Sequence, residues 1–167
     1  VGALLVEREA PFREHSVFSA ACEVGAVISG APDGTVTALR DYGNALGIAF
    51  QIADDLLDVG GASAVMGKHS GDDFRERKMT LPVILAVSAA NEAERGFWER
   101  CIVKGDQTDA DFARARELML RHGALDRTRE RAFEWAGHAR RSLDPLPPTR
   151  LRGILVDLAD HVVDRLR

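Results

Sequence analysis

The sequence GIAFQIADDLLDV, residues 47–59, predicts a helix with two very unequal faces. At about 100° per residue, its polar and acidic positions fall on one narrow stripe. The members of this stripe are Gly47, Gln51, Asp54, Asp55 and Asp58. Apolar residues cover well over half of the helix surface, so the stripe is expected to face a cleft rather than open water.

The three carboxylates of this stripe repel one another, and they stand near the helix C-terminus, where the helix dipole also disfavours negative charge. A hard divalent cation relieves this repulsion, because Mg²⁺ prefers oxygen ligands and is typically held by one or two carboxylates together with substrate phosphates. Asp54 and Asp58 lie one turn apart and can share such an ion, with Asp55 beside them. The alternative is the solvated face of an ordinary amphipathic helix, which needs no function.

The next segment, residues 60–79, is rich in glycine and charge and is longer than most connections between helices. Long loops are often functional, and we interpret this one as a lid that ligand binding orders. Two of the three lysines in the chain, Lys68 and Lys78, lie in it. Lysine is a compact charge suited to phosphate oxygens, although lysines are also common in loops without a function. An acidic helix followed by a basic loop predicts a phosphate site in which neither lysine has a fixed partner before phosphate binds.

Apolar residues recur at helical spacing almost throughout, and alternating β-branched runs are scarce, so the chain is predicted to be all-α. Gly30 and Gly123 are expected to end helices, and Thr80 and Asp109 to cap them. With no internal repeat and no second domain boundary, residues 1–167 are treated as one all-α region. The expected helices are residues 12–29, 35–59, 82–91, 93–104, 110–122, 124–142 and 151–166.

Composition narrows the class of protein. Hydrophobic residues make up 46% of the chain and charged residues 29%, as in a folded globular domain. The net charge is −4 and no basic run is present, which argues against nucleic acid as a partner. Cys22 and Cys101 lack the spacing of a disulfide framework or a zinc site, which favours a reducing, cytoplasmic location. No apolar run approaches the roughly 20 residues that cross a bilayer, so no transmembrane segment is expected.

The informative motifs continue beyond the acidic helix in a fixed order. They are Phe50-Gln51, the DDxxD cluster of Asp54 to Asp58, Gly67-Lys68, Gly71-Asp72-Asp73 and Lys78-Met79-Thr80-Leu81-Pro82. This string resembles the second aspartate-rich region of the trans-type polyprenyl diphosphate synthases. A single DDxxD is a weak signal, but the ordered string is specific, and weaker similarity extends over essentially the whole chain.

The resemblance implies an all-α fold that forms the C-terminal part of the isoprenoid-synthase helical bundle. Enzymes of this family are prenyltransferases of isoprenoid biosynthesis, which condense isopentenyl diphosphate with an allylic diphosphate such as farnesyl diphosphate. They use Mg²⁺ held between two aspartate-rich helices to stabilise the departing diphosphate. The chain is therefore identified as the half that carries the second of these helices.

Site roles follow from the same resemblance. Asp54 is the expected main Mg²⁺ ligand, with Asp55 and Asp58 in support. Lys68 is expected to bind the allylic diphosphate, and Lys78 to be a secondary cationic contact. The remaining expected substrate contacts are Gln51, which lines the substrate site, and Arg13, which takes the place of a family lysine.

Two departures from the family pattern bear on activity. The first aspartate-rich motif, which the family carries far upstream of the second, is absent from these residues, as is the basic pocket for isopentenyl diphosphate. Glu14 also adds negative charge where a diphosphate would lie. We expect the isolated chain to be inactive and to need completion by an N-terminal half. We also expect it to associate, either with that half or in a homo-oligomer. The alternative is a non-catalytic helical partner subunit of a full-length synthase.

Overall fold

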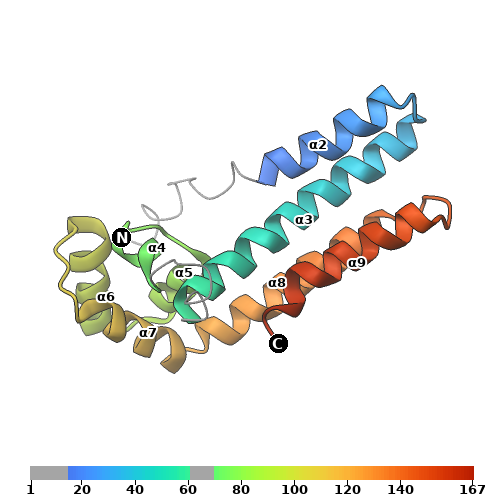
Figure 1. Ribbon diagram of the computed structural model, residues 1–167. Coiled ribbons are helices and arrows are strands. Elements are labelled where there is room, and N and C mark those ends of the chain that lie inside the picture. Colours follow the sequence, from blue (N-terminus) through green and yellow to red (C-terminus); the bar gives the residue numbers. More distant parts are fainter. Residues whose placement is uncertain (1–14, 61–69) are drawn as a thin grey trace. The chain divides into compact units, whose positions relative to one another are not determined.

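The computed structural model describes residues 15–60 and 70–167 (Figure 1), which form two compact units. We call unit 1 the described residues of Asp54–Arg129, and unit 2 the described residues of Pro11–Ala53 together with Glu130–Arg167. Over this described part the regular elements are all helical, which confirms the all-α prediction. In order they are α2 His15–Ile28, α3 Asp33–Gly60, α4 Asp72–Arg75, α5 Leu81–Ala89, α6 Glu92–Trp98, the π-helix η2 Glu99–Lys104, α7 Asp111–Arg121, α8 Ala124–Ser142 and α9 Arg150–Asp164.

The predicted helices are found where the structure describes them, with ends that differ by two residues at most. Positive φ angles of 69° at Gly30 and 62° at Gly123 confirm the helix ends there, because only glycine adopts them without strain. Helix α3 begins at Asp33, earlier than predicted, since the Pro32 carbonyl already accepts the Thr35 N–H at 2.8 Å. Helix α4 was not predicted.

One of the two predicted caps is correct. Thr80 is the N-cap of α5, with a proline in the first helical turn, although its hydroxyl makes no capping bond. Asp109 was wrong as the cap of α7. The carboxylate at that end is Asp111, which accepts the N–H and the hydroxyl of Thr108 at 2.7 and 2.9 Å and pairs with both terminal nitrogens of Arg100. This pairing holds the pKa of Asp111 well below its usual range.

Unit 1 packs around a cluster of aromatic side chains. The Phe74 ring lies 6.4 Å from Trp98 and 6.0 Å from Phe112, measured between ring centroids, and only 3% of Phe74 is exposed. Leu118 and Met119 of α7 are fully buried against the same cluster. Burial of such side chains supplies the main stabilisation of the unit.

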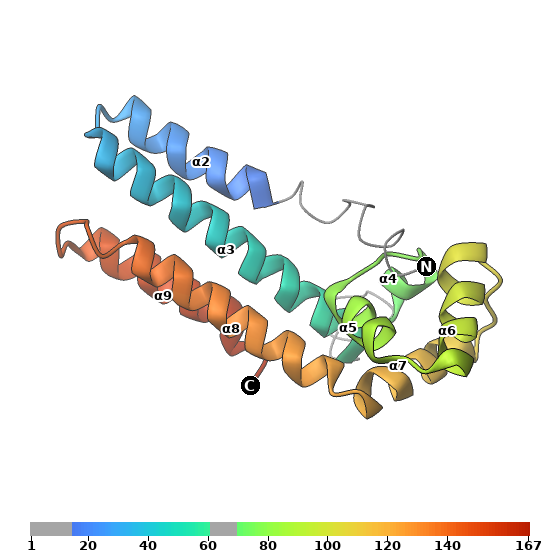
Figure 2. The same cartoon turned by 180° about the vertical axis from the view of Figure 1, so that it is seen from behind.

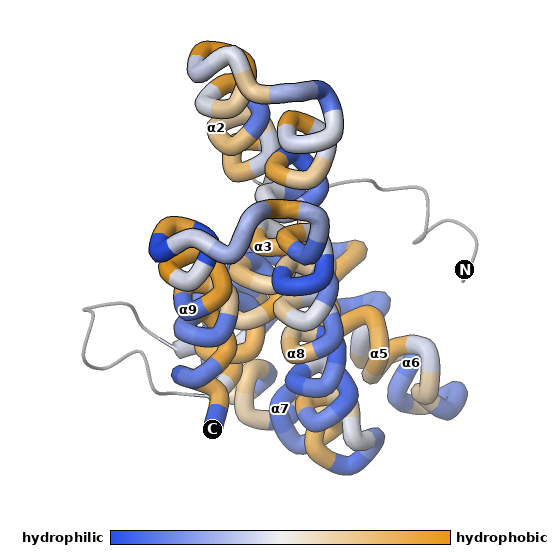
Figure 3. Tube along the Cα trace, turned by 90° about the vertical axis from the view of Figure 1, so that its right-hand side faces the viewer, coloured by the Kyte–Doolittle hydropathy of each residue, from blue (hydrophilic) through white to orange (hydrophobic). Residues whose placement is uncertain are grey.

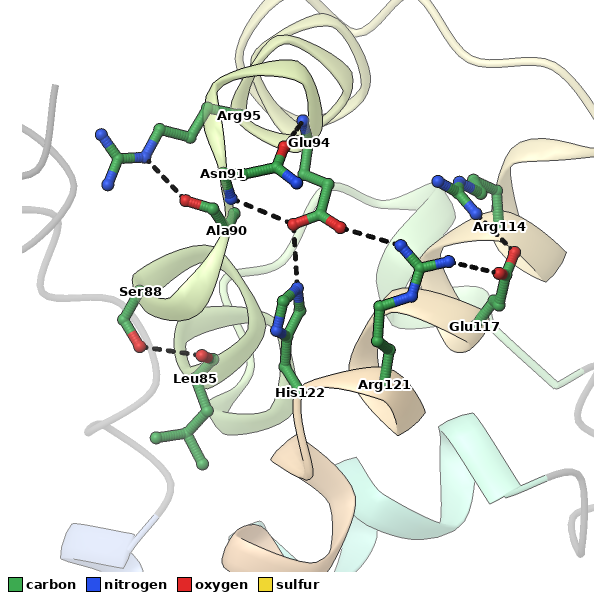
Figure 4. A network of polar contacts seen from close by, with 10 residues as sticks. All are labelled: Leu85, Ser88, Ala90, Asn91, Glu94, Arg95, Arg114, Glu117, Arg121 and His122. Atoms are coloured by element: carbon green, nitrogen blue, oxygen red, sulfur yellow. Dashed lines mark hydrogen bonds and ion pairs between the residues drawn. The ribbon is translucent and has the colours of Figure 1, made fainter.

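A polar network joins α6 to the end of α7 within unit 1 (Figure 4). Asn91 and Glu94 form a capping box, in which each side chain accepts the backbone N–H of the other at 3.0 Å. The same carboxylate pairs with Arg121 at 3.1 Å and lies 2.9 Å from His122 Nε2. Only 5% of Glu94 is exposed, and these hydrogen bonds and the ion pair compensate its buried charge.

This network predicts a pH dependence of stability. Hydrogen bonds from the Asn91 N–H and then from His122 hold the pKa of Glu94 below its ordinary value of 4.5, against the opposing effect of burial. The stabilisation is therefore present above the unfolded pKa and is lost as the pH falls through the lower folded pKa. Glu94→Gln should flatten the fall in melting temperature between about pH 7 and about pH 3. Glu92→Gln, an exposed carboxylate of the same helix, should keep the wild-type profile; identical profiles for Glu94→Gln and wild type would contradict the prediction.

Unit 2 consists of α2, α9 and the adjoining parts of α3 and α8, which run alongside one another (Figures 1 and 2). Helices α2 and α3 meet at Gly43, where a Cβ would lie 2.5 Å from the Phe18 carbonyl oxygen. Tyr42 is buried and donates its hydroxyl to the Leu155 carbonyl of α9 at 2.8 Å. An ion pair between Arg140 and Asp160 joins α8 to α9. Gly43 and the Tyr42 hydroxyl therefore position α3 against α2 and α9 in this unit.

Apolar side chains are also exposed on unit 2. Along α2 and α9, hydrophobic and hydrophilic residues are interleaved (Figure 3). The exposed aliphatic side chains are Val17, Val24, Val27 and Ile28 on α2 and Leu151, Ile154 and Leu158 on α9. Within the described residues, no helix is both long and apolar enough to cross a membrane.

Candidate functional site

The acidic residues predicted from the sequence lie in the last two turns of α3, at the start of unit 1. None of them is openly exposed: Asp54 and Asp58 are partly buried, and 4% of Asp55 is exposed. Among the described residues, the Asp54 carboxylate has no hydrogen bond or ion pair, so its oxygens are available to a ligand. The spacing of Asp54 and Asp58 by four residues places them on the same side of the helix, as predicted.

Asp58 is already engaged by the chain that returns after the loop. Its two carboxylate oxygens accept the N–H groups of Asp72 and Asp73 at 3.2 and 3.3 Å. Its main-chain carbonyl accepts the Ser70 hydroxyl at 2.7 Å and the Gly71 N–H at 3.0 Å. Because each carboxylate oxygen has more than one lone pair, these bonds leave room for a water or a cation.

Burial, and next the charge of Asp73, raise the pKa of Asp58, while the two N–H bonds from Asp73 and Asp72 oppose this rise. The carboxylate therefore stands in a place where negative charge is partly unfavourable. A nearby cation would relieve it, which is the electrostatic condition expected for part of a metal site.

Lys78 differs from the prediction. Its ammonium donates to Asp73 Oδ1 at 2.7 Å and lies 2.9 Å from Glu76 Oε2, so the expectation that it has no fixed partner before phosphate binds was wrong. These contacts, the Asp73 bond foremost, raise the pKa of Lys78 above its ordinary value. With 56% of its side chain exposed, the ammonium still reaches solvent. It has three N–H donors, and the two carboxylates occupy two of them.

The returning segment fits closely against α7. Gly71 has φ 86°, and a Cβ there would lie 2.6 Å from the Phe112 ring. Arg75 adds two contacts here. Its guanidinium lies 5.7 Å from the centroid of the Phe112 ring and donates to the Ser70 carbonyl at 3.0 Å. Any other residue here would adopt a strained φ and would collide with the Phe112 ring, so the position requires glycine.

Three of the predicted site residues need separate mention. Gln51 lies in α3, one turn before the acidic cluster, and is partly buried. Lys68 and Arg13 lie outside the described residues, as do Glu14 and residues 61–69 of the predicted lid, so their roles stay predictions. Sequence reasoning missed Asp73 and Glu76 as partners of Lys78, although two carboxylates within five residues of a lysine were a signal for such pairing.

The acidic side chains at the end of α3 match a divalent cation in donor type. Asp54, Asp55 and Asp58 offer carboxylate oxygens, which suit a hard ion such as Mg²⁺. Over the described ranges, however, no group of three or more His, Cys, Asp or Glu side chains is placed to hold a metal ion. The residues thus fit an ion that takes one or two protein carboxylates and completes its coordination with phosphate oxygens and water, but not a closed protein cage.

The chain is similar to known proteins in sequence and in structure. Residues 15–119 match the family model described as polyprenyl synthetase. The geranylfarnesyl diphosphate synthase of Natronomonas pharaonis is 34% identical over 154 residues, which are 92% of this chain and 43% of that protein.

Two solved structures extend the match. The decaprenyl diphosphate synthase from Rhodobacter capsulatus superposes with a TM-score of 0.86 at 59% identity, over 92% of this chain and 47% of that one. The polyprenyl synthase from Caulobacter crescentus, complexed with calcium and isoprenyl diphosphate, gives a TM-score of 0.85 at 43% identity, over 98% and 54%. The chain spans about half the length of these relatives.

Proposed function

Because this chain belongs to the polyprenyl synthetase family, we propose that it supplies the second aspartate-rich half of a prenyltransferase site. The reaction joins isopentenyl diphosphate to an allylic diphosphate. The observation that supports this most is the acidic end of α3: Asp54 is without a partner among the described residues, and Asp58 is tied to the segment that carries Lys78. Carboxylates for a cation and an ammonium for a phosphate thus belong to one compact unit.

In this proposal Asp54 is the main Mg²⁺ ligand, and Asp55 and Asp58 support it directly or through water. Mg²⁺, when bound there, offsets the negative charge that grows on the departing diphosphate. The relative from Caulobacter crescentus was solved with calcium and isoprenyl diphosphate, which supports a divalent cation and a prenyl diphosphate as joint ligands. The protein's own part is to hold the carboxylates in a partly buried place, where their attraction for cations is stronger than in water.

Cationic residues complete the diphosphate contacts in this proposal. The third donor of the Lys78 ammonium is directed to a phosphate oxygen, while Asp73 and Glu76 keep the other two. Lys68 and Arg13 are further predicted contacts, and Gln51 lines the substrate site from α3. Positioning by several fixed donors is worth more than any single contact, because the diphosphate is oriented before it leaves.

The proposal includes a partner for the chain. Large aliphatic side chains, with 81% of Ile28 and 72% of Leu151 exposed, stand on α2 and α9. A small apolar pocket in the same unit is lined by Phe18, Phe50 and Leu158, among others. Exposed patches of this kind favour association, either with the N-terminal half of a synthase or in a homo-oligomer. A cytoplasmic location also stays a prediction. The two cysteines are free thiols, as a reducing compartment would allow.

Calorimetry tests the metal assignment. We expect pyrophosphate to bind this chain more tightly with Mg²⁺ than without it, and Asp54→Ala to weaken that Mg²⁺-dependent binding by about tenfold or more, equal to about 1.4 kcal/mol. Asp41→Ala, which removes an exposed carboxylate of the same helix, should leave the binding unchanged. Equal affinities for wild type and Asp54→Ala would show that the metal assignment is wrong.

A further inference from the structure

Helix α4 has no cap of its own, and Asp58 supplies one from another helix. The N-cap residue is Gly71, which has no side chain to accept the first N–H groups. The Asp58 carboxylate accepts the N–H groups of Asp72 and Asp73 instead, one on each oxygen. The place of α4 therefore depends on a residue that the sequence assigns to metal binding.

Asp73 links this cap to Lys78. Its N–H is held by Asp58 Oδ2, and its carboxylate Oδ1 accepts the Lys78 ammonium at 2.7 Å. The Asp73 carbonyl also accepts the Lys78 N–H at 2.9 Å. A continuous chain of hydrogen bonds thus runs from the end of α3 to an ammonium that reaches solvent.

Other contacts hold α4 without involving Asp58, and they define the rival explanation. Phe74 is buried in the core of unit 1, and Gly71 fits closely against Phe112. If these contacts alone placed the segment, the Asp58 bonds would contribute to stability and leave Lys78 unaffected. The two explanations differ in what happens to the ammonium when the Asp58 carboxylate is removed.

We infer that Asp58 is a positioning residue, which fixes Asp73 and through it the Lys78 ammonium where a diphosphate oxygen can reach it. This deepens the proposed function and rests on it for the role of Lys78 as a diphosphate contact. The hydrogen-bonded chain itself is independent of that role. This chain of hydrogen bonds assigns Asp73 to the site as the residue that orients the Lys78 ammonium.

Acetylation of individual lysines tests this inference, with N-hydroxysuccinimidyl acetate as the probe and mass spectrometry as the readout. Lys104, which pairs with Glu99 at 3.1 Å, is the internal reference. Asp58→Ala should raise the ratio of Lys78 to Lys104 acetylation by about two- to fivefold, the range expected for the loss of an exposed charge pair. An unchanged ratio in Asp58→Ala would overturn the inference.

Matched variants separate positioning from simple loss of structure. Asp73→Asn should raise the ratio as Asp58→Ala does, and the double variant should add nothing to Asp73→Asn, because both act on one chain of contacts. Asp72→Asn, which removes only the exposed pair with Arg75, should leave the ratio unchanged. Additive effects in the double variant would contradict the inference. If Asp58→Ala does not fold, Asp58→Asn keeps an acceptor for one N–H and should show a smaller rise.

Protection of Lys78 from acetylation by a bound ligand distinguishes failure of the inference from failure of the proposed function. Pyrophosphate with Mg²⁺ should slow the acetylation of Lys78 in wild type and in Asp72→Asn, and should do so less in Asp58→Ala. Protection that is equal in Asp58→Ala and wild type would count against positioning by Asp58. Absence of protection in wild type, together with a raised ratio in Asp58→Ala, would support the positioning role and contradict Lys78 as a diphosphate contact.

Discussion

The 167-residue chain, assayed by itself, is expected to elongate farnesyl diphosphate at no detectable rate. Its sequence holds one DDxxD cluster, at Asp54 to Asp58, whereas the proposed reaction needs the diphosphate to be held from two sides. Removal of even one group that stabilises the transition state lowers a rate by about 10²–10³-fold, and loss of positioning adds to this. Incubation of the purified chain with radiolabelled isopentenyl diphosphate, farnesyl diphosphate and Mg²⁺ is the measurement. Radiolabelled product from the chain alone would contradict this expectation.

Replacing Phe74 by alanine is expected to lower the free energy of unfolding of unit 1 by about 3–5 kcal/mol, the usual cost of removing a buried aromatic ring. The ring is almost fully buried between Trp98 and Phe112, so its removal leaves a cavity that the neighbours fill only in part. Urea denaturation followed by tryptophan fluorescence measures the change.

Phe74→Leu is the matched control for this variant, because it keeps most of the volume and should cost less than about 1.5 kcal/mol. A loss of less than about 1 kcal/mol in Phe74→Ala would show that the aromatic cluster is not the main support of α4.

The helices were predictable because they depend on local signals. Apolar periodicity located them, and glycines with positive φ at residues 30 and 123 ended them. Helix α4 could not be predicted, because its four residues carry no periodic pattern. It depends instead on Phe74, which inserts into the core, and on Asp58, which caps it from another helix. Contacts between residues far apart in the sequence leave no mark on local periodicity.

The candidate site was predictable to a similar degree. The one-turn spacing of Asp54 and Asp58 needs only the geometry of a helix. The partners of Lys78 depend on how the chain turns after residue 70, where several carboxylates compete for the same cation. The wrong prediction of Asp109 as a cap has the same origin. Asp111, two residues later, is also an aspartate, and it is the one that Arg100 can reach and pair with.

The most direct test of the central claim transplants this chain into a relative. The segment of the Rhodobacter capsulatus decaprenyl diphosphate synthase that aligns with this chain would be replaced by residues 1–167, and the chimera assayed with the same labelled substrates. We predict prenyl transfer by the chimera and a loss of about 10²–10³-fold on Asp54→Ala. A chimera that folds and assembles like its parent but forms no product would contradict the claim and favour a non-catalytic partner subunit.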